Sequence, residues 1–143
     1  MATYTSADLN TKPLYSGCEG NCYTYYGTSA ATSTNVATAD KIRVCKVPAG
    51  FVATDVTVVN TTFGTTVPAT VQFEPLDGTA ATTFGSTDML ALQTASASGT
   101  TYAKAPVAVS KDSYVTLLLG TVSAGNGTGV ATLIVRGEGF GAK

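Results

Sequence analysis

Alternation of hydrophobic and polar residues dominates the chain after residue 40 and predicts β-strands. In residues 51–60 (FVATDVTVVN), the even-numbered positions from Val52 to Val58 are expected to share one face, with Asp55 and Thr57 on the other. A period of two residues is that of a strand with one buried side. The segment 69–76 (ATVQFEPL) alternates in the same way.

Further strands are predicted where runs of β-branched or apolar residues are bounded by Gly, Pro, Asn or Asp. The segment 87–94 fits either a short strand or one helical turn, since its apolar residues match neither period well. Asn126-Gly127 is a strong hairpin dipeptide, so we expect the strands on either side of it to pair. The additional strands are expected at 41–47, 105–110, 113–120 and 129–139.

This succession of short strands predicts an all-β fold. Seven or eight strands separated by closely spaced turns are typical of a β-sandwich, including the jelly roll. The chain has 143 residues, which fits one domain, and it is rich in Thr, a residue that favours strands. We predict a jelly-roll-like β-sandwich of seven or eight antiparallel strands with an extended N-terminal arm.

The first forty residues have a different composition. Residues 1–22 contain few clustered hydrophobic residues, and 29–40 is a low-complexity stretch of Ser, Thr and Ala that buries too little apolar surface to fold alone. We predict an extended arm at 1–40, with a short strand near 22–26, and a sandwich domain at 41–143. Aromatic rings favour burial, so the arm is expected to dock through its tyrosines. The candidate interface residues are Tyr4, Tyr15, Tyr23, Tyr25 and Tyr26.

Charge changes the picture by excluding partners. The net charge is −1, and Lys41, Arg43 and Lys46 form the only basic cluster, with Asp40 beside it, so we expect no nucleic-acid partner. The N-terminus has no signal-peptide pattern, and the apolar runs are too short to span a membrane, so we expect no membrane partner. Charged residues make up only 12%, which suggests a surface covered by partners in an assembly.

The residue types also exclude most catalytic chemistry. The chain contains no His, which removes the usual general base and the commonest zinc ligand. The Gly-rich end GEGFG (137–141) has no helix after it to present amides to phosphate, so we interpret it as a flexible tail. Glu74 is expected on an exposed strand face, and most aspartates adjoin predicted turns or strand starts. We predict no enzymatic activity, no catalytic residue, no metal site and no cofactor.

The three cysteines leave alternatives open. Cys18 and Cys22 are separated by three residues, unlike zinc knuckles or thioredoxin motifs, and no second pair completes a site. They are a candidate disulfide, because the Gly-containing loop between them could bend enough. The alternatives are two reduced thiols packed as small hydrophobic groups, or a three-cysteine metal site that would need another ligand. Cys45, within a strand, is expected in the core.

Two stretches resemble small structural proteins of tailed-bacteriophage virions. They are ADKIRVCKVPAGFVATDVTVV (39–59) and the closing GVATLIVRGEGF (129–140). Such proteins commonly carry a strand-turn-strand pattern of the form IRLxKLPAG followed by VxDVxV. The matching residues here are Ile42, Arg43, Lys46, Pro48, Ala49, Gly50, Asp55, Val56 and Val58.

The resemblance implies a capsid decoration (cement) protein or another minor head protein, often a jelly roll. Such a virion structural protein would bind the outer surface of a tailed-phage head and stabilise it. Its expected partners are the major capsid protein and copies of itself in a homotrimer, at the capsid surface after assembly in the host cytoplasm. The alternatives are another virion component (head fibre, tail tube or receptor-binding tip) or a carbohydrate-binding β-sandwich module.

Overall fold

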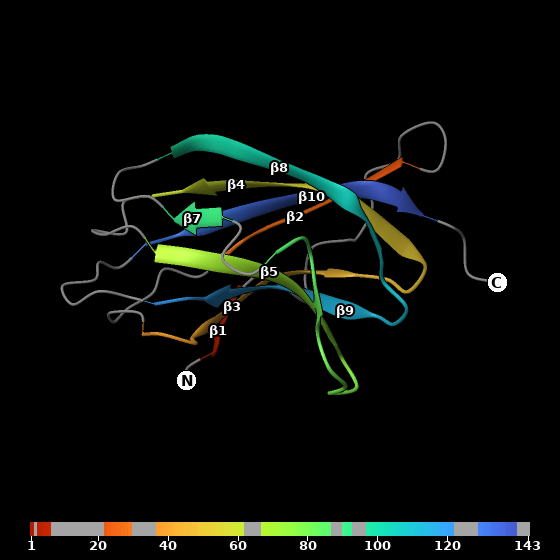
Figure 1. Cartoon of the computed structure of the whole chain (residues 1–143), viewed down its shortest axis with the longest axis horizontal. Helices are drawn as coiled ribbons and strands as arrows, with labels where there is room; N and C mark the ends of the chain where they lie inside the picture. The colour runs from red at the N-terminus through yellow and green to blue at the C-terminus, as the bar shows by residue number, and fades with distance from the viewer. Residues whose placement is uncertain are drawn as a thin grey trace.

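The computed structural model describes residues 1, 3–6, 22–29, 37–61, 67–86, 90–92, 97–121 and 129–139, which form β-strands and no helix (Figure 1). This confirms the prediction of an all-β fold. No helix in these ranges is long and apolar enough to cross a membrane. The strands are β1 (Thr3–Thr5), β2 (Cys22–Thr28), β3 (Lys41–Val47), β4 (Phe51–Asn60), β5 (Val67–Pro75), β6 (Thr82–Thr83), β7 (Leu90–Leu92), β8 (Ala97–Ala108), β9 (Ser113–Leu119) and β10 (Ala131–Gly139).

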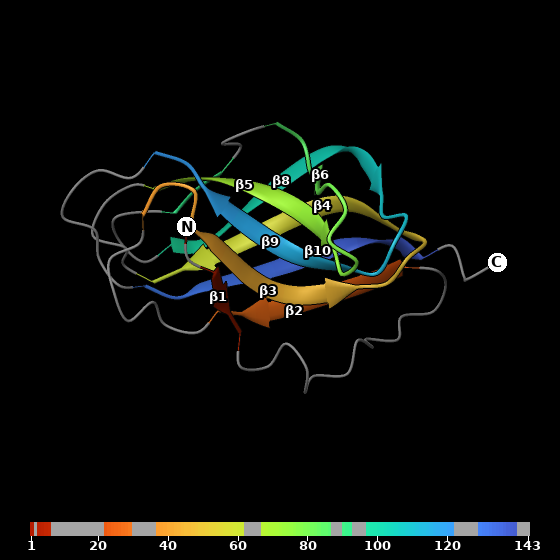
Figure 2. The same ribbon diagram turned by 90° about the horizontal axis from the view of Figure 1, so that it is seen from below.

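The strands form two layers. One sheet has the order β1-β3-β9-β5-β6, with β7 also paired to β5, and the other has the order β2-β10-β4-β8 (Figures 1 and 2). Four antiparallel pairs are nested along the chain: β2 with β10, β3 with β9, β4 with β8, and β5 with β7. A long hairpin folded over into two sheets gives this pattern, which is that of a jelly roll.

Eight strands therefore build the jelly roll, and β1 and β6 are additions to one sheet. The strand expected near 22–26 is the first of the eight, because β2 pairs with β10 from Cys22 to Thr28. β1 runs parallel to β3, with Tyr4 opposite Ile42. The division of the chain at residue 40 into an arm and a domain stays a prediction.

The expected hairpin around Asn126-Gly127 is wrong. β9 lies between β3 and β5 in one sheet, whereas β10 lies between β2 and β4 in the other. The segment after β9 therefore crosses from one layer to the other, and the turn dipeptide itself falls outside the described residues. Local turn chemistry was a poor guide because, in a jelly roll, partner strands are distant in sequence.

A β-bulge in β4 also corrects the predicted faces of that strand. Arg136 pairs with Asp55 and Gly137 with Ala53, so Thr54 is left out of the register. Before the bulge, Ala53 points inward and is fully buried, whereas Val52 is only partly buried. The prediction that Val52 and Thr54 share the face of the later valines is wrong, because an extra residue reverses the alternation.

A second register shift explains why two neighbouring residues of β3 are both buried. Arg43 pairs with Thr116 and Cys45 with Val115, so Val44 is the extra residue. Val44 and Cys45 then both face the core, while Arg43 remains on the outer side. The expectation that Cys45 belongs to the core is confirmed.

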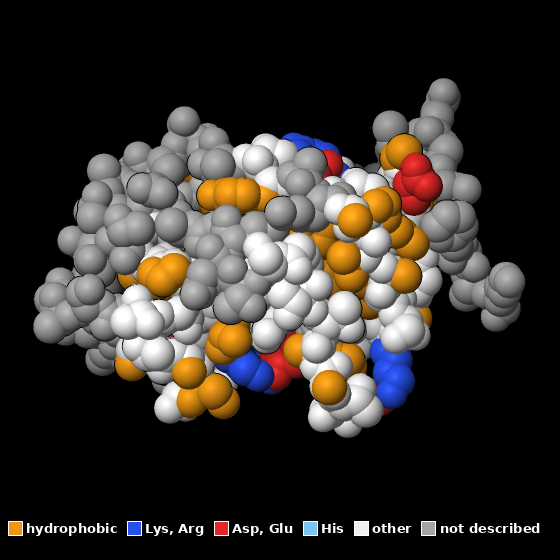
Figure 3. All heavy atoms as spheres, in the orientation of Figure 1, with side chains coloured by type: hydrophobic (Ala, Val, Ile, Leu, Met, Phe, Trp, Pro, Cys, Tyr) orange, Lys and Arg blue, Asp and Glu red, His pale blue; other side chains and the backbone are white. Residues whose placement is uncertain are grey.

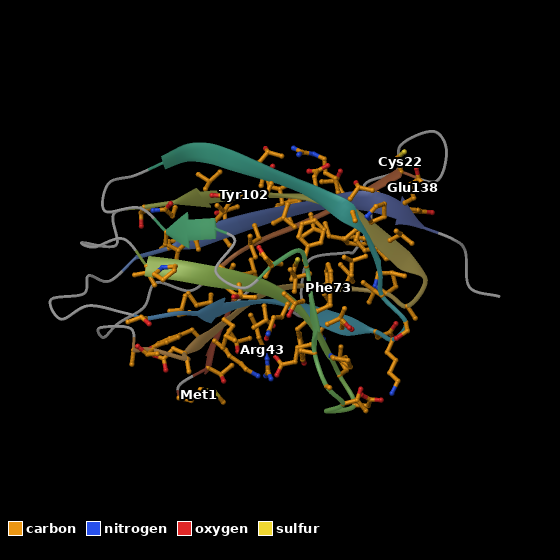
Figure 4. The ribbon with its side chains drawn as sticks, viewed as in Figure 1. Met1, Cys22, Arg43, Phe73, Tyr102 and Glu138 are labelled. Atoms are coloured by element: carbon orange, nitrogen blue, oxygen red, sulfur yellow. The ribbon has the colours of Figure 1, made fainter. Side chains whose placement is uncertain are left out.

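The core lies between the two sheets, where Phe73 points in Figure 4. The predicted alternation of 69–76 is confirmed, since Val71 and Phe73 are buried and Glu74 lies on the other face. Phe84 packs edge-on against Phe73 with ring centroids 6.3 Å apart. The largest fully buried side chains are Phe51, Phe73, Phe84, Ile42, Leu92, Leu117, Leu119, Leu133 and Val44.

The middle of the chain supplies two strands. Segment 87–94 contains the short strand β7 rather than a helical turn. The strand expected at 105–110 is the end of the longer β8. Pro106 lies where the register between β4 and β8 shifts, which suits a residue that has no amide hydrogen for the sheet.

The glycine-rich end is part of the sheet, so its interpretation as a flexible tail is wrong for 137–139. A Cβ at Gly137 would meet the Val52 carbonyl and the Phe51 ring, and one at Gly139 would meet the Tyr23 ring. The missing side chains leave room for these neighbours, and the strand continues through Gly139. Residues 140 and 141 lie outside the described part.

Ala39 has a backbone conformation that favours glycine. Its φ is 68°, in the left-handed region, within a turn that Asp40 closes by accepting a hydrogen bond from Ala37 N at 2.9 Å. An L-residue is strained there, so Ala39→Gly should raise the free energy of unfolding by about 0.5–1 kcal/mol. Chemical denaturation would measure the gain, and an unchanged or lower stability would contradict the argument.

Candidate interaction surface

The tyrosines predicted to form an interface divide between the core and the surface. Tyr25 is buried and packs edge-on against Phe51, with ring centroids 5.0 Å apart. Tyr23 stacks on Tyr25 at 6.4 Å, and Tyr4 is partly buried against the same core. Burial raises the pKa of Tyr25 above its ordinary value. Tyr15 lies outside the described residues.

Among the described tyrosines of this group, Tyr26 is the one that faces outward. Its side chain is 55% exposed, on the outer face of the β2-β10-β4-β8 sheet. Directly across from it on β10 is Ile134, which is itself partly exposed. Thr28 and Thr132 lie beside this pair and share a hydrogen bond of 2.9 Å. These four residues form an uncharged part of the outer face. We call this part, made of Tyr26, Ile134, Thr28 and Thr132, the Tyr26 face.

Arg136, on the same sheet, is paired with a single carboxylate. Arg136 Nη1 donates to Asp55 Oδ1 at 2.9 Å and to Thr57 Oγ1 at 3.1 Å. An open depression of about 220 Å³ lies beside Arg136, near Cys22 and Glu138 at one end of the sheet (Figure 4). The charged side chains that line this depression do not point toward a common ligand position, because Arg136 already binds Asp55.

The two described cysteines, Cys22 and Cys45, have different environments. Cys22 is exposed at the start of β2, and Cys45 is buried, which raises the pKa of the Cys45 thiol to about 12. A thiol with so high a pKa is a poor nucleophile and a poor metal ligand at neutral pH. Cys18 lies outside the described residues, so the Cys18–Cys22 disulfide stays a prediction. Among the described residues, no three acidic or cysteine side chains gather in a way that could hold a metal ion.

A charged group occupies the outer face of the other sheet, and we call it the Glu74 cluster. Lys41 Nζ donates to Glu74 Oε1 at 2.9 Å, and Arg43 Nε donates to Glu74 Oε2 at 3.0 Å. Thr116 Oγ1 donates to the same Oε2 at 3.3 Å. The Arg43 guanidinium lies over the Tyr114 ring, 4.7 Å from its centroid. Three neighbouring strands thus bring together a carboxylate, two cations and an aromatic ring.

The strand register explains how these residues meet. Glu74 of β5 lies directly across from Tyr114 of β9, and Arg43 of β3 lies across from Thr116. All point away from the core, and Figure 4 shows Arg43 on the outer side of its layer. In Figure 3, blue and red atoms adjoin one another at this lower edge of the molecule.

Electrostatics at the cluster favour the charged form of the carboxylate. The hydrogen bond from Arg43 holds the pKa of Glu74 down to about 2, against the opposing effect of burial, and the bond from Lys41 adds to the lowering. The same carboxylate raises the pKa of Arg43. Only 15% of the Glu74 side chain is exposed, so these contacts are partly shielded from water.

The sequence revealed part of this cluster. The basic alternation Lys41, Arg43, Lys46 was visible, but Asp40 was its apparent acidic neighbour. In the structure the Asp40 carboxylate closes its own turn, and the counter-ion is Glu74, more than thirty residues away. The acidic residue opposite a basic strand is a usable signal only once the pairing of β3, β9 and β5 is known.

Comparisons with known proteins bear on the fold. No protein-family model and no curated protein sequence matches the chain. A chain from the capsid of Ralstonia phage GP4 is similar in structure, with a TM-score of 0.67, 14% identity, and coverage of 96% of this chain and 99% of that one. A chain from the cyanophage Pam1 capsid asymmetric unit has a TM-score of 0.61 and 22% identity, with coverage of 93% and 95%. The chain therefore shares the fold of single chains found in two phage capsids.

Proposed function

We propose that this chain is a virion structural protein that binds the outer surface of a tailed-phage head and stabilises it, as a decoration protein. The observation that carries the proposal is the extent of the structural likeness to the two capsid chains. Each of those chains is matched over at least 95% of its length, so the shared unit is one small jelly roll rather than a domain of a larger subunit.

The physical character of the molecule supports this role. Among the described residues, the groups with perturbed pKa values are a buried thiol, a core tyrosine and members of surface ion pairs, none of which forms a catalytic pair. A rigid sandwich that repeats over a shell can bind many sites at once, and many weak contacts then combine into strong attachment. Such a protein needs stable surfaces rather than a cleft.

The direct test uses heads of the phage that encodes this chain, assembled without it. Purified protein is added, and the particles are reconstructed by electron microscopy and heated to follow DNA release. We expect new density on the outer surface and release at a higher temperature. Density within the continuous shell itself would indicate a coat subunit, and protein confined to tails would also contradict the proposal.

We further propose that copies of the chain associate as a homotrimer through the Tyr26 face. An exposed tyrosine beside a partly exposed isoleucine, flanked by threonines and a neutralised ion pair, is typical of the centre of a protein interface. Self-association also fits a protein that must cross-link neighbouring shell subunits.

Tyr26→Ser should shift the protein from trimer toward monomer, because it removes the largest exposed side chain of this face. Light scattering after size exclusion would measure the mass over a range of concentrations. Leu76→Ser is the matched control, since Leu76 is 46% exposed but lies beyond the end of β5. Equal masses for wild type and Tyr26→Ser would contradict this interface.

A further inference from the structure

Arg43 is held in place with part of its hydrogen-bonding capacity unused. Its Nε is bound to Glu74, and its flat face lies on the Tyr114 ring. Neither Nη nitrogen donates to any residue in the described part of the chain, although the side chain is 30% exposed. When the Nε edge and one face of a guanidinium are both held, its two Nη groups point in a defined direction. Their N–H groups then form a planar fork of donors.

The cluster also carries unbalanced charge. Among the described residues, Lys41 and Arg43 share the single carboxylate of Glu74, so the ion pairs of this cluster leave an excess of one positive charge. Within the described ranges Lys41 Nζ makes one hydrogen bond, to Glu74, and an ammonium has three donors. Lys46 also contacts this group, with its Nζ 5.4 Å from the Tyr114 centroid.

Two other cations in the described part of the chain are paired. On the opposite sheet Arg136 is matched by Asp55, and Lys111, just before β9, is matched by Asp77, just after β5. The whole chain carries a net charge of −1. A positive excess on one sheet face of a slightly acidic protein favours an anionic partner at that face.

We propose that Arg43, supported by Lys41, binds an Asp or Glu carboxylate on the surface of a neighbouring head protein. The planar fork matches two carboxylate oxygens, and the contact would be charge-assisted and directional. A nucleic-acid strand is a poorer occupant, because two cations neutralise too few phosphates for counterion release to give useful affinity. The inference rests on the proposed function, and it names the sheet face β3-β9-β5 as the side that meets the shell.

The test compares variants for binding to heads assembled without this chain. Arg43→Gln keeps Glu74 paired with Lys41, whereas Arg43→Lys keeps the charge and loses the fork. Lys111→Gln is the matched control, because it removes the same charge from an exposed ion pair outside both the Glu74 cluster and the Tyr26 face. At about 0.15 M salt we expect about tenfold or greater loss of affinity for Arg43→Gln, a smaller loss for Arg43→Lys, and a change within about twofold for Lys111→Gln.

The outcomes separate the inference from the proposed function. If wild type fails to bind heads, the proposed function fails and the inference fails with it. If wild type binds and Arg43→Gln binds equally well, only the inference is overturned. Thermal unfolding followed by circular dichroism checks that each variant folds. If Arg43→Gln does not fold, Arg43→Lys and Lys41→Gln are used in its place. The inference is overturned if both of these variants fold and bind heads with wild-type affinity. A lower oligomer mass for Arg43→Gln with unchanged head binding would assign the fork to a second copy and also overturn it.

Discussion

Gly27→Ala should lower the free energy of unfolding by about 3 kcal/mol, at the upper end of what added core volume costs. Gly27 faces inward from β2, and a Cβ there would collide with the backbone carbonyl of Val44, with the carbonyl carbon at 2.9 Å and the Cys45 Cβ at 3.2 Å. Because the obstacle is backbone, it cannot rotate away, and β2 and β3 would have to separate.

Gly78→Ala is the matched control for this substitution. Gly78 has a φ of 79° and no atom within 4 Å of an added Cβ, so alanine there meets backbone strain without a clash. The expected cost is about 1 kcal/mol. Urea unfolding of both variants would give the two values. A Gly27→Ala variant as stable as Gly78→Ala would mean that the two sheets can separate at little cost.

Glu74→Gln should destabilise the protein at neutral pH by about 2 kcal/mol, allowing for partial solvent screening. The loss arises because Lys41 and Arg43 would lose their shared counter-ion. The pKa of Glu74 is lowered from 4.5 to about 2 on folding, so its stabilisation is present in full above pH 4.5 and is lost as the pH falls toward 2. The stabilities of wild type and variant should therefore converge in acid.

Asp77 provides the comparison for this pH dependence. The hydrogen bond from Lys111 also lowers the pKa of Asp77 to about 2, but both side chains of that pair are 48% exposed. Asp77→Asn should therefore have a smaller effect, and about 1 M salt should remove most of it. Unfolding curves between about pH 2 and 7 would measure both series, since both carboxylates change charge in that range. A constant difference between wild type and Glu74→Gln across this range would contradict the assigned pKa.

The features that could be predicted from sequence are the ones that depend on neighbouring residues. Alternation at Val71 and Phe73 marked a strand and its buried face, because the side-chain period of two is a local property. The succession of such strands was enough to indicate a sandwich. Register is different, since one extra residue at Thr54 reverses which side chains face the core.

The unpredicted features depend on contacts between distant segments. Glu74 meets Arg43 only because β9 lies between β5 and β3, and no local pattern encodes that order. Gly137 and Gly139 suggested a flexible end, yet they belong to a strand whose neighbours need the space of a missing side chain. Tyr25 is buried and Tyr26 faces outward because side chains alternate along β2, and the interface role expected for these tyrosines stays a prediction.

The nested pairing of the strands has a consequence for how the protein is made. β10, the last strand of the jelly roll to leave the ribosome, lies between β2 and β4, two of the earliest. Until it is synthesised, these two strands have an open position between them and unpaired backbone groups on facing edges. The sheet can therefore close only after β10 has been released, and folding dominated by such distant pairings is slow. During that interval the open position could accept a strand from another nascent copy, so a high local concentration of unfinished chains is the condition under which misassembly is expected.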